Sequence, residues 1–239
     1  MTHEFSRTEL LLGADGLERL ANATVMVLGV GGVGSHCIEA LARSGVGTFI
    51  LVDSDKVSIS NVNRQSIAYL STVGEYKTKL MKYRIRDING EARVFTYEQF
   101  VLPENLHTVF THKVDYIVDA IDTVTAKLAI AEYAKEQKIP LISCMGTGNK
   151  LHPELFEITD ISKTSVCPLC KVMRRELRAR GISHLKVLYS KEEPIAVKEQ
   201  AGEEGAGARR RVPGSVSFVP PVAGLLIAGE VIRELAAVE

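Results

Sequence analysis

Short apolar runs alternate with amphipathic stretches through the first 145 residues of this 239-residue chain. Runs of this length, separated by stretches with helical periodicity, are typical of buried parallel strands joined by helices. We expect strands at 25–28, 48–52, 92–97, 116–120 and 141–144, and helices at 9–20, 35–43, 77–89, 102–112 and 124–137. The pattern predicts an α/β fold with a Rossmann-type, doubly wound and mostly parallel sheet.

The pattern changes after residue 145. Here we expect a C-terminal extension of strands and helices, with strands at 155–161, 185–189 and 215–219, and helices at 168–180 and 221–237. The stretch from Gln200 to Pro213 is rich in Gly, Glu and Arg, so we expect a mobile loop at about 195–213. We predict one domain over 1–239, with a nucleotide-binding core at 1–145 and a substrate-binding and dimer-forming extension at 146–239.

The composition is that of an ordinary globular protein, with 46% hydrophobic residues, 24% charged residues and a net charge of +0. The longest apolar stretch, Val219 to Ile232, is interrupted by Pro220, Pro221 and Glu230 and is too short to span a bilayer. No N-terminal stretch resembles a signal peptide. Together with four cysteines, this predicts a cytoplasmic protein without membrane insertion.

A glycine-rich loop, GVGGVG at 29–34, lies between the first strand and the helix at 35–43. Glycine allows a tight turn and a close approach of phosphate, and the helix N-terminus favours an anion. Asp53 follows about 20 residues later, where a carboxylate meets ribose hydroxyls. The loop therefore predicts a nucleotide site formed by Gly29, Gly31, Gly32, Gly34 and Asp53.

Three further residues, Asn61, Arg64 and Lys77, indicate a triphosphate. Arg and Lys neutralise phosphate oxygens, and NAD has no third phosphate to use them. Asp122 ends the sequence DAID at the carboxyl edge of the strand 116–120, where a carboxylate facing a triphosphate suits Mg²⁺. We therefore expect ATP and Mg²⁺ as cofactors. Each residue also has a structural explanation, such as a helix cap or a surface ion pair.

Positive charge is concentrated between residues 163 and 211, where 12 Lys or Arg face 6 Asp or Glu, a balance of +6. On the helix at 168–180, four cations share one stripe, and Leu169, Val172, Met173 and Leu177 lie on the other side and are expected to be buried. The predicted tRNA-binding stripe comprises Lys171, Arg174, Arg175 and Arg178. Lys186, Lys191 and Arg209 to Arg211 could extend it, and a solvated helix face is the alternative.

The cysteines include one CxxC pair, Cys167 and Cys170, while Cys37 and Cys144 are isolated. A tetrahedral zinc site needs four ligands, so we expect no structural zinc. A zinc site that uses Cys144 with the pair, or a redox-active pair, remains open. Cys144 ends a strand at the active edge, so it is either a buried packing residue or a nucleophile.

Five stretches carry a resemblance to a known family: GVGGVG (29–34), LVDSD (51–55), SNVNRQ (60–65), GEYKT (74–78) and DAID (119–122). Residues 1–145 resemble the adenylating superfamily that includes MoeB, ThiF, HesA and the ubiquitin-activating enzymes. Its members join a carboxylate to AMP with release of pyrophosphate. The resemblance implies that Asp53 holds the ribose, that Asn61, Arg64 and Lys77 hold the phosphates, and that Asp122 binds Mg²⁺. Asp55 is expected to be a further ATP-binding residue.

The same resemblance assigns Arg7 a role in the partner subunit's site and so implies a homodimer. Five further features, one of them the basic helix after Pro168, resemble a narrower branch, the tRNA threonylcarbamoyladenosine dehydratases. The other four are Asn63 within NVNRQ, TDISKTS (159–165), YSKEEP (189–194) and GSVSFVPPVAG (214–224). This branch implies ATP-dependent dehydration, by cyclisation, of threonylcarbamoyladenosine next to the tRNA anticodon, with Arg7, Arg64, Lys77 and Asp122 as catalytic residues.

Three other functions compete with this interpretation. One is adenylation of the C-terminal Gly-Gly of a ubiquitin-like sulfur-carrier protein, against which the single CxxC and the basic stripe argue. The second is an NAD-linked oxidoreductase, which would leave Arg64 and Lys77 unexplained. The third is a non-catalytic RNA-binding module. The sequence leaves open a monovalent cation, a cysteine-desulfurase or sulfur-acceptor partner, and the choice of tRNA.

Overall fold

A seven-stranded sheet forms the centre of the computed structural model, which describes residues 2–196 and 213–238. In spatial order the strands are β3 (Arg93–Tyr97), β2 (Thr48–Val52), β1 (Thr24–Leu28), β4 (Tyr116–Asp119), β5 (Leu141–Cys144), β7 (Lys186–Ser190) and β6 (Phe156–Asp160). All neighbouring strands are parallel except β6 and β7. The predicted doubly wound, mostly parallel sheet with a C-terminal extension is therefore confirmed.

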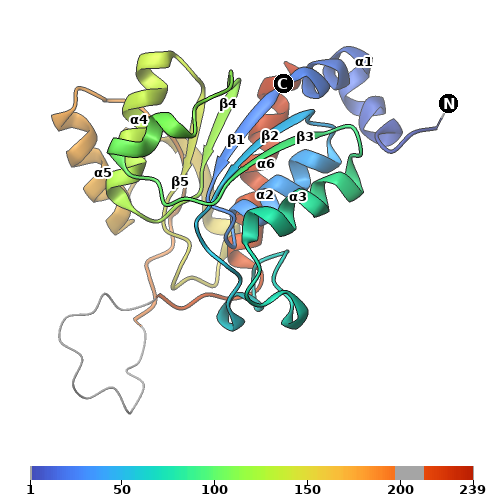
Figure 1. The fold of residues 1–239 in the computed structure, drawn as a ribbon. Coiled ribbons are helices and arrows are strands. Elements are labelled where there is room, and N and C mark those ends of the chain that lie inside the picture. The colour runs from blue at the N-terminus through green and yellow to red at the C-terminus, as the bar shows by residue number, and fades with distance from the viewer. Residues whose placement is uncertain (1, 197–212, 239) are drawn as a thin grey trace.

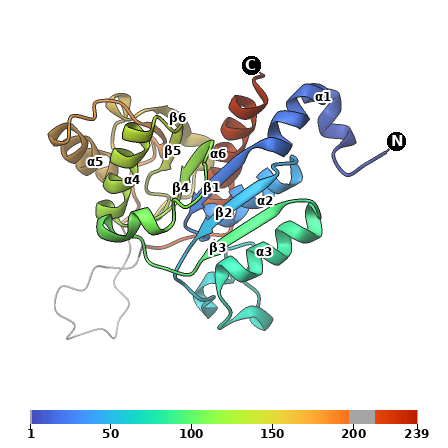
Figure 2. The ribbon, with the colours of Figure 1, turned by 45° about the horizontal axis from the view of Figure 1, so that its top comes forward.

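Helices cover both faces of the sheet (Figure 1; Figure 2). One face carries α2, α3 and α6, the other carries α4 and α5, and α1 packs against α6. Their bounds are α1 (Ser6–Asn22), α2 (Gly34–Arg43), α3 (Lys77–Ile88), α4 (Val124–Gln137), α5 (Pro168–Ala179) and α6 (Val219–Ala236). No helix among the described residues is long and apolar enough to cross a membrane.

The central strand β1 is apolar at every position except Thr24, because both of its faces are covered by helices. Val25 and Val27 belong to the hydrophobic core beneath α2 and α6, whereas Met26 and Leu28 belong to the core beneath α4. Successive side chains of a strand point to opposite faces. A strand with helices on both sides is therefore apolar at every position.

Two predicted elements were wrong. The segment 102–112 forms only a short 3-10 helix, Pro103–Thr108. The Asn105 side chain accepts from the Leu102 N–H and donates to the Phe100 carbonyl, so it closes a local turn that competes with a longer helix. No strand forms at 215–219, because the Ser215 carbonyl accepts from the Asn63 side chain and α6 already starts at Val219. Most of the predicted loop at 195–213 lies outside the described residues.

Close packing between α2 and α6 depends on Gly224. A Cβ atom at this position would lie 2.3 Å from the Val33 carbonyl oxygen and 3.0 Å from the Cys37 backbone nitrogen. Backbone atoms cannot move away as a flexible side chain can. Only glycine therefore allows α6 to approach the start of α2, the helix that begins at the glycine-rich loop.

We expect Gly224→Ala to lower the free energy of unfolding by about 1–3 kcal/mol, because it overpacks this contact. Gly229→Ala on the same helix is the matched control. Its Cβ would meet only the Arg233 side chain at 3.5 Å, so the better helix propensity of alanine should stabilise the protein by up to about 1 kcal/mol. Urea unfolding measures both, and equal effects of the two substitutions would contradict the packing argument.

Candidate functional site

A cavity of about 580 Å³ opens at the carboxyl edge of the sheet. This size is typical of pockets for small ligands. Five segments provide most of its lining, namely 29–33, 52–55, 61–65, 120–123 and 144–148. Three of them directly follow β1, β4 and β5, so the order of the sheet brings together residues that lie far apart in the sequence.

The glycine-rich loop needs its glycines for steric reasons. Gly29 has a φ of +92°, and a Cβ there would lie 2.7 Å from the Ala120 carbonyl oxygen. A Cβ on Gly34 would lie 1.8 Å from the Gly29 carbonyl oxygen. The loop therefore turns tightly against the loop after β4, and α2 begins within it, with its N-terminus at the cavity.

Asp53, at the end of β2, is fixed by two backbone groups. One carboxylate oxygen accepts from the Val30 N–H at 2.6 Å and the other from the Asp55 N–H at 2.8 Å. Burial raises the pKa of Asp53, while Lys77 and these backbone hydrogen bonds oppose the shift. The carboxylate is thus held against the glycine-rich loop, where it was expected to meet a ribose.

Lys77, at the start of α3, places a buried cation in the same cavity. Its Nζ lies 2.7 Å from Oδ2 of Asp55. The Lys77 side chain is 6% exposed, whereas that of Asp55 is 64% exposed. Asp55 therefore stabilises the ammonium group from the solvent side.

Asn61 and Arg64 both line the cavity from the segment between β2 and α3. Asn61 also accepts from the Ser58 N–H, so the same side chain caps a turn and lines the cavity. One guanidinium nitrogen of Arg64 donates to the Ser60 carbonyl and to the Asn63 side chain, both at 2.8 Å. Burial lowers the pKa of Arg64, because desolvation disfavours the charged form of the guanidinium group.

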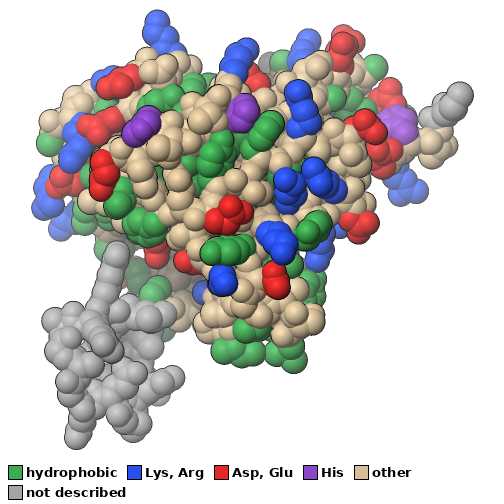
Figure 3. Space-filling view, viewed as in Figure 1, with side chains coloured by type: hydrophobic (Ala, Val, Ile, Leu, Met, Phe, Trp, Pro, Cys, Tyr) green, Lys and Arg blue, Asp and Glu red, His purple; other side chains and the backbone are tan. Residues whose placement is uncertain are grey.

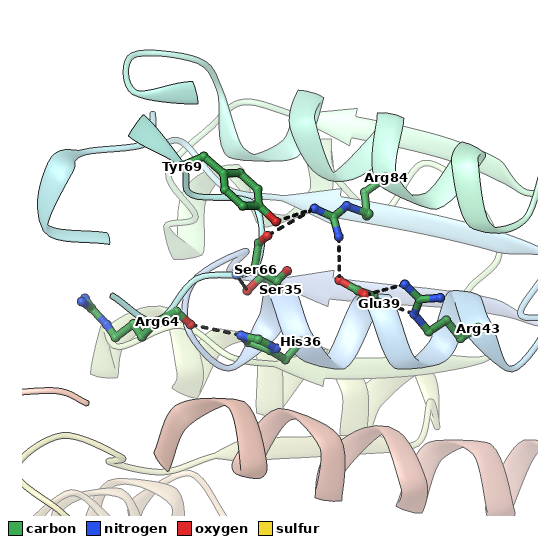
Figure 4. Close-up of polar contacts among 8 residues, drawn as sticks. All are labelled: Ser35, His36, Glu39, Arg43, Arg64, Ser66, Tyr69 and Arg84. Atoms are coloured by element: carbon green, nitrogen blue, oxygen red, sulfur yellow. Dashed lines mark hydrogen bonds and ion pairs between the residues drawn. The ribbon is translucent and has the colours of Figure 1, made fainter. Parts of the chain in front are cut away.

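A polar network ties this segment to α2 and α3 (Figure 4). The His36 ring donates to the Arg64 carbonyl at 3.1 Å, and the Ser35 hydroxyl accepts from the Ser66 N–H at 3.1 Å. Arg84 donates to the Tyr69 hydroxyl at 2.9 Å. Arg64 is therefore positioned by the helix that begins at the glycine-rich loop.

The opposite wall rests on a fully buried ion pair. The Lys127 Nζ donates to Asp119 Oδ2 at 2.9 Å, to the Ser143 hydroxyl at 3.2 Å and to the Cys144 carbonyl at 2.7 Å. Ser143 in turn donates to Asp119 at 2.5 Å. The ammonium group on α4 thus bonds to both β4 and β5 at their carboxyl ends, directly beside the two loops that line the cavity.

Asp122 lies exposed on the loop after β4, and the Thr123 hydroxyl donates to it at 3.4 Å. Its carboxylate is therefore available to a ligand. Across the described residues, no group of three or more His, Cys, Asp or Glu side chains is arranged to hold a metal ion. A cation at this place would need oxygen atoms from the ligand itself, and triphosphate oxygens fit that need.

Sequence reasoning missed several residues that line the cavity. Gln65 is buried, and its Oε1 atom has no hydrogen-bond partner in the described structure, so a bound nucleotide would satisfy it. Phe100, Met145, Leu169 and Pro220 add apolar lining. Gln65 was part of a recognised motif, but nothing in the sequence indicated that its side chain is buried.

The cysteines are all free and buried. Burial raises the pKa of Cys144 to about 12, so the thiol is neutral and a poor nucleophile. This favours packing over covalent chemistry. The pair at the start of α5 differs, because Cys170 lowers the pKa of Cys167.

The basic stripe on α5 is only partly free. Arg174 is half-buried and donates to the Thr164 carbonyl at 3.0 Å, and Arg175 bonds to Glu176. Val172, expected to be buried, is 38% exposed, because α5 buries only its narrow face of Cys170, Met173 and Leu177. Lys171 and Arg178 remain exposed. Lys186 and Lys191 pair with Glu230 and Glu157, and residues 209–211 lie outside the described range.

Arg7 is exposed on α1 and does not line the cavity of its own chain. The two leucines that follow it closely, Leu10 and Leu11, are 84% and 85% exposed. An apolar pair of this kind on an amphipathic helix is unusual for a surface without a partner. The role of Arg7 in the cavity of a partner subunit therefore stays a prediction.

A phosphate-binding loop at the carboxyl edge of a doubly wound sheet is characteristic of a nucleotide-binding protein. The family model described as ThiF family matches residues 5–239, so the chain belongs to the ThiF family.

The chain is 48% identical over 242 residues to the tRNA threonylcarbamoyladenosine dehydratase of Bacillus subtilis, with 98% of this chain and 95% of the relative aligned. Its fold is similar to that of the Escherichia coli tRNA N6-threonylcarbamoyladenosine dehydratase, TcdA, solved in complex with ATP. The TM-score is 0.87 at 32% identity, covering 98% of this chain and 94% of the other. The same protein in complex with AMP gives a TM-score of 0.88.

We expect Lys127→Met to destabilise the protein by about 3–5 kcal/mol, because it leaves the buried Asp119 carboxylate without its countercharge. The double variant Asp119→Leu, Lys127→Met removes both charges and should recover part of this loss. Urea unfolding of the wild type and the two variants tests the expectation. A single variant within about 0.5 kcal/mol of the wild type would mean that the pair is not buried as described.

Proposed function

We propose that this protein uses ATP to dehydrate threonylcarbamoyladenosine in tRNA to its cyclic form. One observation carries the proposal. Arg64, Lys77, Asp122 and the glycine-rich loop surround a single cavity in a chain 48% identical to a named dehydratase of this modification. The ATP and AMP complexes of TcdA support the nucleotide assignment.

The reaction proceeds in two displacements. A carboxylate oxygen of the threonyl group attacks the α-phosphorus of ATP, and pyrophosphate leaves. The carbamoyl group then closes on the activated carbonyl carbon, one of its N–H groups loses a proton, and AMP leaves with the former carboxylate oxygen. The net change in the nucleoside is the loss of one water.

The residues around the cavity act by position and charge. Arg64 and Lys77 neutralise the phosphates, Asn61 and the glycine-loop amides orient them, and Asp53 holds the ribose. Asp122 would hold Mg²⁺, which when bound neutralises the charge that develops on pyrophosphate. Lys77 exchanges Asp55 for a phosphate oxygen, so its charge is never left without a partner.

The partners follow from the same argument. Two copies form a homodimer in which Arg7 of each copy reaches the other's cavity, supported by the exposed Leu10 and Leu11 beside it. On α5, Lys171 and Arg178 contact the tRNA backbone.

Asp122→Asn should reduce turnover at least about a hundredfold, because the carboxylate that holds the metal is lost. Arg64→Ala should reduce turnover to a similar extent, because a cation that neutralises the phosphates is lost. Asp15→Asn, an exposed carboxylate on α1, is the matched control and should keep wild-type activity. Turnover is measured as AMP formation and as the mass of the nucleoside from tRNA that carries threonylcarbamoyladenosine.

An outcome in which Asp122→Asn retains near-normal turnover would show that the assigned site is wrong. If the wild type leaves the tRNA unchanged but exchanges pyrophosphate with a protein that ends in Gly-Gly, the substrate is a sulfur carrier instead. Unfolding free energies should stay within about 0.5 kcal/mol of the wild type, since Asp122 is exposed.

The shared site predicts complementation. Arg7→Ala and Asp122→Asn should each be inactive alone. A mixture should regain activity, because a hybrid dimer has one cavity with both residues intact. Random pairing predicts up to about a quarter of wild-type activity. A mixture as inactive as its components, although exchange of subunits is observed by mass spectrometry, would place Arg7 outside the partner's site.

A further inference from the structure

A second groove lies between α3 and the edge strand β3. It is lined by Tyr76, Lys79, Lys82, Tyr83, Arg86, Thr96 and Glu98, and we call it the α3 groove. One end of the groove lies next to the nucleotide cavity along the chain, since Tyr76 precedes Lys77 and Glu98 precedes Gln99, and both Lys77 and Gln99 line that cavity. A polymer bound in the groove would therefore pass close to the nucleotide cavity.

Cations dominate the groove. Lys79, Lys82 and Arg86 recur at helical spacing along one side of α3, and Figure 3 shows Lys and Arg side chains gathered over this helix. Lys79 pairs weakly with Glu75 at 3.5 Å, both about half exposed. Lys82 and Arg86 form no ion pair with any described residue.

The acidic groups that face the groove are few. Glu98 accepts from the Thr78 hydroxyl at 2.8 Å, and Asp87 follows Arg86 on the outer side of α3. The cations on α3 thus outnumber the carboxylates that could neutralise them. Two of these cations, Lys82 and Arg86, are available to an anionic ligand.

Two exposed tyrosines accompany the cations. Tyr76 and Tyr83 are 39% and 58% exposed, and Lys56 lies over the Tyr76 ring with its Nζ 4.8 Å from the centroid. Exposed aromatic rings between cations are how proteins bind single-stranded RNA, because unpaired bases stack on the rings while phosphates meet the cations. The stripe on α5 has no such aromatic residue.

We propose that the α3 groove binds the unpaired nucleotides of the tRNA anticodon loop, with bases stacked on Tyr83 and phosphates paired to Lys82 and Arg86. The inference rests on the proposed function, which places the reacting nucleoside next to the anticodon. An acidic protein would satisfy the cations but would gain little from two exposed rings. A loop of single-stranded RNA satisfies both.

The test measures binding of an anticodon stem-loop RNA by fluorescence anisotropy over a range of salt concentrations. Lys82→Gln with Arg86→Gln should weaken binding about tenfold and reduce the salt slope by about 1.4, because two single-strand phosphate contacts are lost. Lys113→Gln with Lys138→Gln is the matched control. Both residues are exposed and precede β4 and β5 at the edge opposite the cavity, so affinity should not change.

Tyr83→Leu isolates stacking. It should weaken binding of the stem-loop about tenfold, yet leave binding of a fully paired RNA duplex unchanged, because paired bases cannot stack on the ring. ATP affinity should equal that of the wild type for every variant, which shows that the nucleotide site is intact. Equal losses for duplex and stem-loop would overturn the stacking role.

Three results would overturn the proposal as a whole. If the wild type converts tRNA but the α3 variants bind like the wild type, the groove is not the RNA site and the proposed function stands. If Lys82→Gln with Arg86→Gln changes the oligomeric state, the groove is an interface between copies. If the wild type neither binds nor converts tRNA, the proposed function fails together with this inference.

Discussion

The buried contact of Lys127 with Asp119, Ser143 and the Cys144 carbonyl fixes where the two loops of the far pocket wall begin. An ion pair without solvent contributes little net stability, because desolvation of both charges offsets their attraction. Its consequence is positional: β4 and β5 must end at one level for the ammonium group to reach both. The loops that carry Asp122 and Met145 start from those ends, and the shape of the cavity follows.

The near wall is organised differently. There, glycines at 29 and 34 let backbone approach backbone, and Asp53 ties the loop to β2 through the Val30 N–H. Arg64 belongs to a separate segment, between β2 and α3, which is hydrogen-bonded to α2 through His36 and Ser35. Rigid backbone thus provides the anion-binding surface, while Lys77 keeps a countercharge in Asp55. An exposed countercharge can be exchanged for phosphate at small cost.

Much of this arrangement could be predicted from the sequence. The apolar runs correctly predicted the parallel strands. One cavity is indeed lined by the predicted site residues, namely the glycine-rich loop, Asp53, Asn61, Arg64, Lys77 and Asp122. What failed depended on contacts between distant residues. Asn105 closes a local turn where a helix was expected, and Ser215 bonds to Asn63 instead of joining the sheet. Arg174 has the spacing of a free surface cation, yet Thr164 engages it. Side-chain partners of this kind leave no periodic signal.

The proposed reaction requires that the substrate carboxylate itself attacks ATP. Labelling the threonyl carboxylate of the tRNA substrate with ¹⁸O and analysing the nucleotide product by mass spectrometry tests it directly. If the carboxylate attacks, AMP carries one ¹⁸O atom from the carboxylate and the cyclic nucleoside retains the other. AMP without label, or ADP as the product, would contradict it.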